Sequence, residues 1–132
     1  MILDTSAIIA ILKNEAEADV FSEAIEAAKT VRISAANYLE THLLVDRYRN
    51  PILNARLETI FENPGIQIEP VTVEQAKIAR SAYRDYGKGS GHRANLNFGD
   101  CFSYALAREK REPILFKGDD FVHTDLRSAL GS

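Results

Sequence analysis

Five acidic residues occupy positions at which an α/β fold gathers functional groups: Asp4, Glu40, Asp100, Asp119 and Asp120. Asp4 and the Asp119–Asp120 pair directly follow short apolar runs that read as strands. Glu40 and Asp100 lie in segments with helical spacing, each among apolar neighbours. Because functional groups of parallel α/β sheets collect at the carboxyl ends of strands, we expect these acids to meet at one edge of a sheet.

Carboxylates that meet at such an edge repel one another, and burial further raises their pKa values at a cost in stability. A hard divalent cation such as Mg²⁺ or Mn²⁺ removes that cost, because it prefers oxygen ligands. One or two such ions can activate water and hold the oxygens of an in-line phosphoryl displacement. The acidic pattern is therefore compatible with a metal-dependent phosphodiesterase.

Each acid also has a purely structural interpretation. Asp4 can cap the helix that follows it. Asp100 stands three residues after Asn97, as in a capping box, and a helix start favours an acid. Glu40 can lie on a solvated helix face, and Asp119–Asp120 is typical of a turn. A non-catalytic binding module that keeps these acids as caps is thus a second hypothesis.

A phosphoacceptor receiver domain is a third hypothesis, since it is also an α/β domain of similar size. That class places an acidic pair at the first strand and an Asp after the third strand. Here Asp4 stands alone, and the third predicted strand leads to Glu69 and Pro70. The sequence therefore disfavours a receiver domain.

Strands and helices are predicted to alternate along the chain. We expect strands at residues 1–3, 30–33, 66–68 and 113–116, with a short edge strand at 121–126. Helices are expected from Ser6 to 12, and at 15–29, 35–45, 51–61, 73–86 and 97–110, with a loop at 87–96. This alternation predicts a three-layer α/β/α sandwich whose central, mainly parallel sheet has four to five strands.

Composition favours an ordinary globular protein in one domain over residues 1–132, with 45% hydrophobic and 27% charged residues. The only cysteine is Cys101, which excludes an internal disulfide and fits a reducing cytoplasm. No apolar run approaches the length of a membrane span, and no basic residue precedes Lys13 as a secretory leader would require. The net charge of −3 argues against tight nonspecific nucleic-acid binding by charge alone.

Four motifs resemble those of a known family. They are Met-Ile-Leu-Asp-Thr-Ser-Ala at 1–7, Ser-Ala-Ala-Asn-Tyr-Leu-Glu-Thr at 34–41, Leu-Asn-Phe-Gly-Asp-Cys-Phe-Ser-Tyr-Ala at 96–105 and Pro-Ile-Leu-Phe-Lys-Gly-Asp-Asp-Phe at 113–121. In this order and spacing they resemble a PIN-domain ribonuclease, specifically a VapC-type toxin of a type II toxin–antitoxin system. The resemblance covers nearly the whole chain.

The resemblance implies a Mg²⁺- or Mn²⁺-dependent endoribonuclease whose acidic quartet is Asp4, Glu40, Asp100 and Asp119. Asp120 is an alternative fourth acid: counting from Leu115 favours Asp119, whereas counting back from Phe121 favours Asp120. Asp4 and Asp100 are expected to bind the metal chiefly, with Glu40 and the fourth acid completing the site through waters. A PIN nuclease of RNA processing remains an alternative within the same family.

Residues around the acids are expected to assist them. Thr5, Ser6 and Asn97 are similar to groups that orient the carboxylates of the family, and each can also cap a helix. A glycine-rich basic loop with Lys88, His92 and Arg93 precedes Asp100, and it is either a contact for RNA phosphates or a solvated loop.

The resemblance also implies partners: an RNA substrate, a VapB-type antitoxin and a second copy of the chain in a homodimer. An antitoxin helix would need exposed apolar surface. Five apolar residues of the early helices are candidates for that surface, with core packing as the alternative: Ile9, Leu12, Phe21, Leu43 and Leu44.

Overall fold

A computed structural model describes residues 1–131. Within this range there are four strands: β1 (Ile2–Leu3), β2 (Val31–Ser34), β3 (Ile66–Glu69) and β4 (Ile114–Leu115). The helices are α1 (Thr5–Leu12), α2 (Ala18–Ala27), α3 (Ala35–Arg47), α4 (Pro51–Phe61), α5 (Val73–Tyr86) and α6 (Phe98–Lys110). Ser132, the last residue of the domain predicted from the sequence, lies outside the described residues.

The strands form one parallel sheet in the order β3-β2-β1-β4. Ile2 pairs with Ile114, and Leu3 pairs with Leu115. Since side chains alternate across a strand, these two pairs face opposite sides of the sheet. Leu3 and Leu115 pack in one hydrophobic cluster, while Ile2 and Ile114 pack in another.

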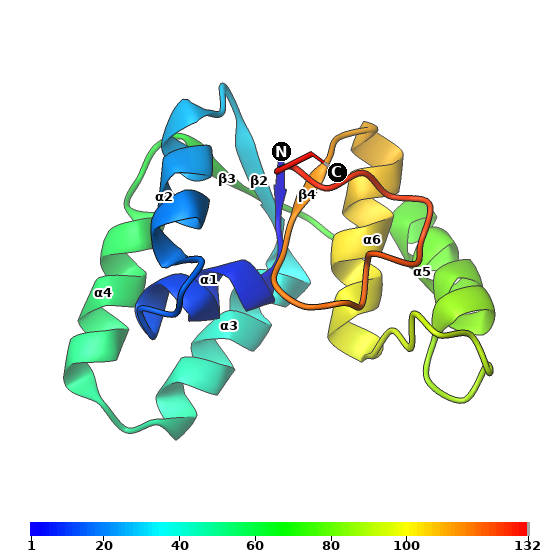
Figure 1. The fold of residues 1–132 in the computed structure, drawn as a ribbon, viewed down its shortest axis with the longest axis horizontal. Helices are drawn as coiled ribbons and strands as arrows, with labels where there is room; N and C mark the ends of the chain where they lie inside the picture. The colour runs from blue at the N-terminus through cyan, green and yellow to red at the C-terminus, as the bar shows by residue number, and fades with distance from the viewer. Residues whose placement is uncertain (132) are drawn as a thin grey trace.

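Helices cover both faces of the sheet (Figure 1), and one of the two clusters lies between each face and its helices. Helices α1 to α4 contribute to the cluster of Leu3, whereas α5 and α6 pack on the face of Ile2. Leu12 and Phe21 are buried core residues of the first layer. The expectation that they form an exposed surface for a partner is therefore wrong: both are nearly inaccessible to solvent. The three-layer α/β/α architecture expected from the sequence is confirmed.

Polar side chains fix where the helices begin. Asp4 caps α1 and accepts a hydrogen bond from the Ser6 backbone, so Asp4 rather than Ser6 is the cap. Ser34 caps α3 in the same manner. Asn97 and Asp100 form the capping box expected at the start of α6. Asp4 after β1 and Ser34 at the end of β2 therefore each end a strand and start a helix.

The main differences from the sequence expectation concern the start of α2 and residues 121–126. Helix α2 begins at Ala18 rather than at residue 15, because Glu15 and Glu17 lie in the turn before it. Residues 121–126 form turns and no strand. The edge of β4 is instead bordered by residues 127–129, through a single parallel bridge between Ile114 and Ser128. The described sheet thus has four strands, and the fifth strand expected at 121–126 is wrong.

Charged groups also tie neighbouring strands of the sheet together. Arg32 of β2 binds Glu69 and Glu112 at 2.6 and 2.9 Å. Glu112 also accepts a hydrogen bond from the amino group of Met1. Among residues 1–131, every helix is too short or too polar to traverse a lipid bilayer.

Candidate active site

A cleft of about 320 Å³ opens at the carboxyl edge of the sheet. Its walls come from the starts of α1 and α6, the middle of α3 and the loop after β4. The residues that line it are Asp4, Thr5, Ser6, Ile9, Glu15, Glu40, Leu44, Asn97, Asp100, Lys117 and Asp120. The sheet edge thus brings together the acids of four sequence motifs.

Asp4 lies at the centre of the cleft floor and is almost fully buried. One carboxylate oxygen lies 2.5 Å from the Ser103 hydroxyl, and the other accepts hydrogen bonds from the hydroxyl and backbone of Ser6. The Asp4 backbone N–H donates to the carbonyl of Leu115, which fixes the residue beside β4. Burial raises the pKa of Asp4 above its ordinary value, and the hydrogen bonds from Ser103 and Ser6 oppose that rise.

Glu40 reaches the cleft from α3 and is held by two side-chain donors. Thr5 donates to it at 2.8 Å and the Asn37 amide at 3.2 Å. Asn37 is completely buried, and its amide also donates to the Gly99 carbonyl at 2.9 Å. Thr41 donates a further hydrogen bond toward Thr5. The carboxylate is therefore fixed by groups that cross between α1, α3 and α6.

Asp100 faces Asp4 from the first turn of α6. Its carboxylate accepts from the Asn97 backbone at 3.0 Å, which leaves its remaining lone pairs toward the cleft. Burial is the main cause that raises the pKa of Asp100 to about 8, and the nearby carboxyls of Asp4 and Asp120 raise it further. Burial and the neighbouring carboxyls therefore both favour the protonated form of Asp100.

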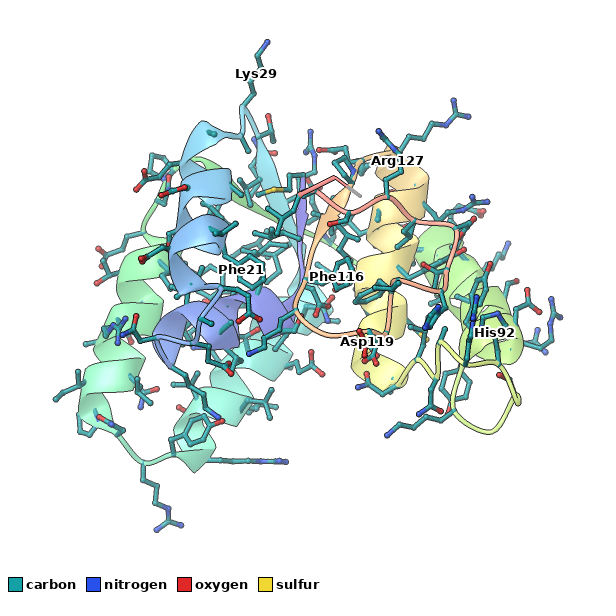
Figure 2. All side chains as sticks on the ribbon, in the orientation of Figure 1. Phe21, Lys29, His92, Phe116, Asp119 and Arg127 are labelled. Atoms are coloured by element: carbon teal, nitrogen blue, oxygen red, sulfur yellow. The ribbon has the colours of Figure 1, made fainter. Side chains whose placement is uncertain are left out.

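The two candidates for the fourth acid occupy different environments. Asp120 is half-buried, lines the cleft and lies within reach of the Asp100 carboxyl. Asp119 is exposed and does not contribute to the lining. Figure 2 shows the turn that carries Asp119 at the same end of the molecule as the start of α6. The geometry therefore favours Asp120 over Asp119.

The basic loop stands apart from the cleft. None of Lys88, His92 and Arg93 is part of the lining. Lys88 and Arg93 are exposed. The His92 ring accepts a hydrogen bond from the Ala94 backbone and packs edge-on against Tyr86, toward the α5 side in Figure 2. These contacts hold His92 within its own loop, and it does not reach the acids of the cleft.

Sequence reasoning missed the buried polar residues that hold the acids. Asn37 precedes Glu40 by three positions, and Ser103 follows Asp100 by three. Residues three apart share a helix face, so this spacing is a signal that could have found both. The neighbouring Cys101 has its pKa raised to about 11, mainly by burial, and it remains a neutral thiol. A buried neutral thiol of this kind is a poor nucleophile.

Comparison with known proteins places the chain in a family. Residues 1–126 match the model of the PIN domain. Ribonuclease VapC28 of Mycobacterium tuberculosis is 52% identical over 130 residues, which cover 98% of both chains. The chain belongs to the PIN-domain family of VapC ribonucleases. It is a ribonuclease of the toxin class, and its acidic cleft lies at the sheet edge described above.

Two solved PIN-fold structures share this architecture. The Mycobacterium tuberculosis toxin VapC20, described as cleaving the sarcin–ricin loop, superposes with a TM-score of 0.74 at 19% identity, covering 95% of each chain. A toxin–antitoxin complex from Klebsiella pneumoniae gives a TM-score of 0.69 at 18% identity and covers 94% of this chain and 92% of that one. At this identity both comparisons support the fold.

The donor set of the cleft suits a hard divalent cation, since it consists of carboxylate, hydroxyl and amide oxygens. Within residues 1–131, no three Asp, Glu, His or Cys side chains stand close enough to enclose a metal ion as they are. Burial, and to a smaller extent the neighbouring carboxyls, raise the pKa values of Asp4 and Asp100. A bound cation would favour the ionised form of both groups.

Gly99 generates a test of the Glu40 position. A methyl group added at Gly99 would overlap the Glu40 carboxylate. In an ordinary helix, Gly→Ala stabilises by about 1 kcal/mol. We expect Gly99→Ala to lower RNA cleavage by roughly tenfold or more through displacement of Glu40. Cleavage assays with Glu40→Ala and Glu40→Ala/Gly99→Ala check the cause, because Gly99→Ala should not lower cleavage further once the Glu40 carboxylate is removed. An equal loss of cleavage from Gly99→Ala in the parent and in Glu40→Ala would contradict this explanation.

The raised pKa of Asp100 predicts how the stability of the metal-free protein depends on pH. Between about pH 4 and pH 8 the unfolded chain releases the Asp100 proton while the folded chain retains it, so stability should fall as pH rises through this window. We expect a loss of roughly 2 kcal/mol in EDTA, and a smaller loss in Asp100→Asn, which cannot titrate there. Urea unfolding at several pH values measures both. Parallel pH profiles for the two proteins would refute the expectation.

Proposed function

We propose that this ribonuclease cuts RNA phosphodiester bonds endonucleolytically with Mg²⁺ or Mn²⁺ held by Asp4, Asp100, Glu40 and Asp120. The observation that supports the proposal is the convergence of these four carboxylates on one cleft, where hydrogen-bond donors orient three of them, Asp4, Glu40 and Asp100. Asp119, the other candidate for the fourth acid, has no role in this proposal because it is exposed and outside the lining.

The divalent cation would supply an activated water molecule and positive charge against the phosphate. The residues of the chain keep their oxygens aimed at the cleft. The Ser103 hydroxyl donates to one Asp4 oxygen, and the Ser6 hydroxyl donates to the other. Thr5 and Asn37 hold Glu40. The Asn97 backbone holds Asp100. These contacts involve only groups of the chain itself, so they would limit the reorganisation that binding of the cation and RNA requires.

An antitoxin of the VapB type is the proposed inhibitor, in agreement with the toxin–antitoxin complex among the fold neighbours. An apolar groove suited to a helical segment runs along α1 and α4, lined by Ile11, Pro51, Ile52, Ala55, Arg56, Thr59 and Ile60. Ile52 is 70% exposed at its rim. We assign the antitoxin segment to this groove. Since the substrate is RNA, the toxin would act in the cytoplasm.

A homodimer is proposed through a different apolar face, between α3 and α6. Leu39, Leu43 and Phe98 are more than half exposed there, and Phe102 packs edge-on against Phe98. The groove along this face also contains Glu40, so it adjoins the catalytic cleft. Burial of four such side chains between two copies would remove a large apolar patch from water.

Substitution of the acids tests the catalytic proposal. We expect Asp4→Asn, Asp100→Asn and Asp120→Asn each to lower metal-dependent RNA cleavage by at least about 100-fold and to relieve growth arrest, because each removes a charged ligand. Asp119→Asn is the matched control and should cut RNA like the parent. Purified proteins incubated with total RNA, with Mg²⁺ or with EDTA, give the measurement. Full cleavage by Asp100→Asn, or cleavage unaffected by EDTA, would overturn the proposal.

The two surfaces are tested by a matched pair of substitutions. Phe98→Asp and Ile52→Asp each place a carboxylate in the first turn of a helix, where it is tolerated. We expect Phe98→Asp to convert the dimer to a monomer and Ile52→Asp to leave it a dimer that the antitoxin inhibits poorly. Light scattering gives the mass, and cleavage with added antitoxin gives the inhibition. A dimer that survives Phe98→Asp, or full inhibition of Ile52→Asp, counts against the corresponding assignment.

A further inference from the structure

Lys117 is the basic side chain of the cleft. Among the described residues that line it, five carry carboxyl groups and Lys117 alone carries a positive charge. RNA brings further negative charge into this cleft with every phosphate. The net charge of the whole chain is −3, so no general excess of positive charge compensates. A cation of the protein at this position is therefore the group best placed to attract the RNA backbone.

The Lys117 backbone is fixed at the floor of the site. Its N–H donates to the Ser6 hydroxyl at 2.9 Å, and Ser6 in turn donates to Asp4 at 2.6 Å. The Lys117 backbone is thus linked to Asp4, one of the proposed catalytic acids, by two hydrogen bonds through Ser6. Its position does not depend on its own side chain, because the contact is made by the backbone.

The Lys117 ammonium group is held at the rim by two acids of the turn before α2. It lies 2.6 Å from Glu15 and 3.3 Å from Glu17, and all three side chains are about one third exposed. These two carboxylates raise the pKa of Lys117, so it is charged at neutral pH. An ion pair this accessible contributes little free energy, since water screens it. A phosphate can therefore replace the two carboxylates at small cost.

We propose that Lys117 binds a backbone phosphate of RNA at the cleft and that Glu15 and Glu17 hold its ammonium group until RNA displaces them. The compact ammonium on a flexible stem suits a point-charge contact to phosphate that carries no base specificity. The inference rests on the proposed RNA-cleaving function and assigns that site its contact to the substrate backbone. Lys117 acts here as a binding and positioning residue, because the acids supply the chemistry.

The experiment measures RNA binding rather than turnover. All variants carry Asp100→Asn so that the RNA stays intact, and the probe is a short fluorescent single-stranded RNA of mixed sequence at fixed Mg²⁺. We expect Lys117→Met to weaken binding roughly three- to tenfold and to reduce the slope of log affinity against log salt by about 0.7, the value for one phosphate contact on a single strand. Lys117→Arg should restore the slope.

Two controls separate this role from a structural one. Lys29→Met removes the same charge from an exposed lysine that Figure 2 shows at the opposite end of the molecule from Asp119, and it should leave the salt slope unchanged. Glu15→Gln/Glu17→Gln should strengthen RNA binding by freeing Lys117, and that gain should largely vanish when Lys117→Met is added. If the ion pairs served only to attach the loop after β4 to the turn before α2, both changes would lower the melting temperature and neither would move the slope.

The possible results separate a failure of the proposed Lys117 role from a failure of the proposed RNA-cleaving function. An unchanged salt slope in Lys117→Met, with cleavage by the unsubstituted chain intact, overturns the inference alone. An equal gain from Glu15→Gln/Glu17→Gln in the presence and absence of Lys117 overturns the holding role of the two acids. A chain that neither binds nor cuts RNA overturns the proposed function and this inference together.

Discussion

Buried negative charge at the carboxyl edge of the sheet is the constraint on which this site depends. Asp4 and Asp100 are both nearly inaccessible, and burial raises the pKa of each. Removal of carboxylates from water without a partner is costly, so such a cluster is retained only where its chemistry is used. Hydrogen bonds from the surrounding hydroxyl and amide groups offset part of this free-energy cost. The cost that remains favours the binding of a cation in the cleft.

Asn37 links the elements that carry the acids. Its amide nitrogen binds both Glu40 and the Gly99 carbonyl, and its amide oxygen lies 3.0 Å from the Ser103 hydroxyl. Ser103 continues the link to Asp4. One fully buried amide therefore sets the spacing between α3, α6 and the end of β1. A buried polar network of this kind specifies a single arrangement, because each unmade hydrogen bond is penalised in a dry interior.

Much of the fold, and the meeting of Asp4, Glu40 and Asp100 in one cleft, could be predicted from the sequence, because local signals agree with the tertiary structure. Pro51 after Asn50 sets the start of α4, and helix α5 has the bounds that its apolar spacing indicates. The fourth acid could not be decided, since Asp119 and Asp120 are neighbours in a turn whose direction depends on packing of the loop after β4. The turns at residues 121–126 escaped prediction for the same reason: an edge segment is decided by its partner rather than by its own propensity.

The parallel pairing of β1 with β4 has a consequence for the order in which the enzyme becomes active. The contact of Ser6 with Lys117 spans 111 positions, and that of Asp4 with Ser103 spans 99. A chain that emerges from the ribosome from its amino end cannot make either contact until nearly all of it has been synthesised. A shorter nascent chain holds Asp4 and Glu40 but neither Asp100 nor the strand that places Asp120. The acidic cleft is thus complete only when the carboxyl-terminal part of the chain has folded onto the amino-terminal part.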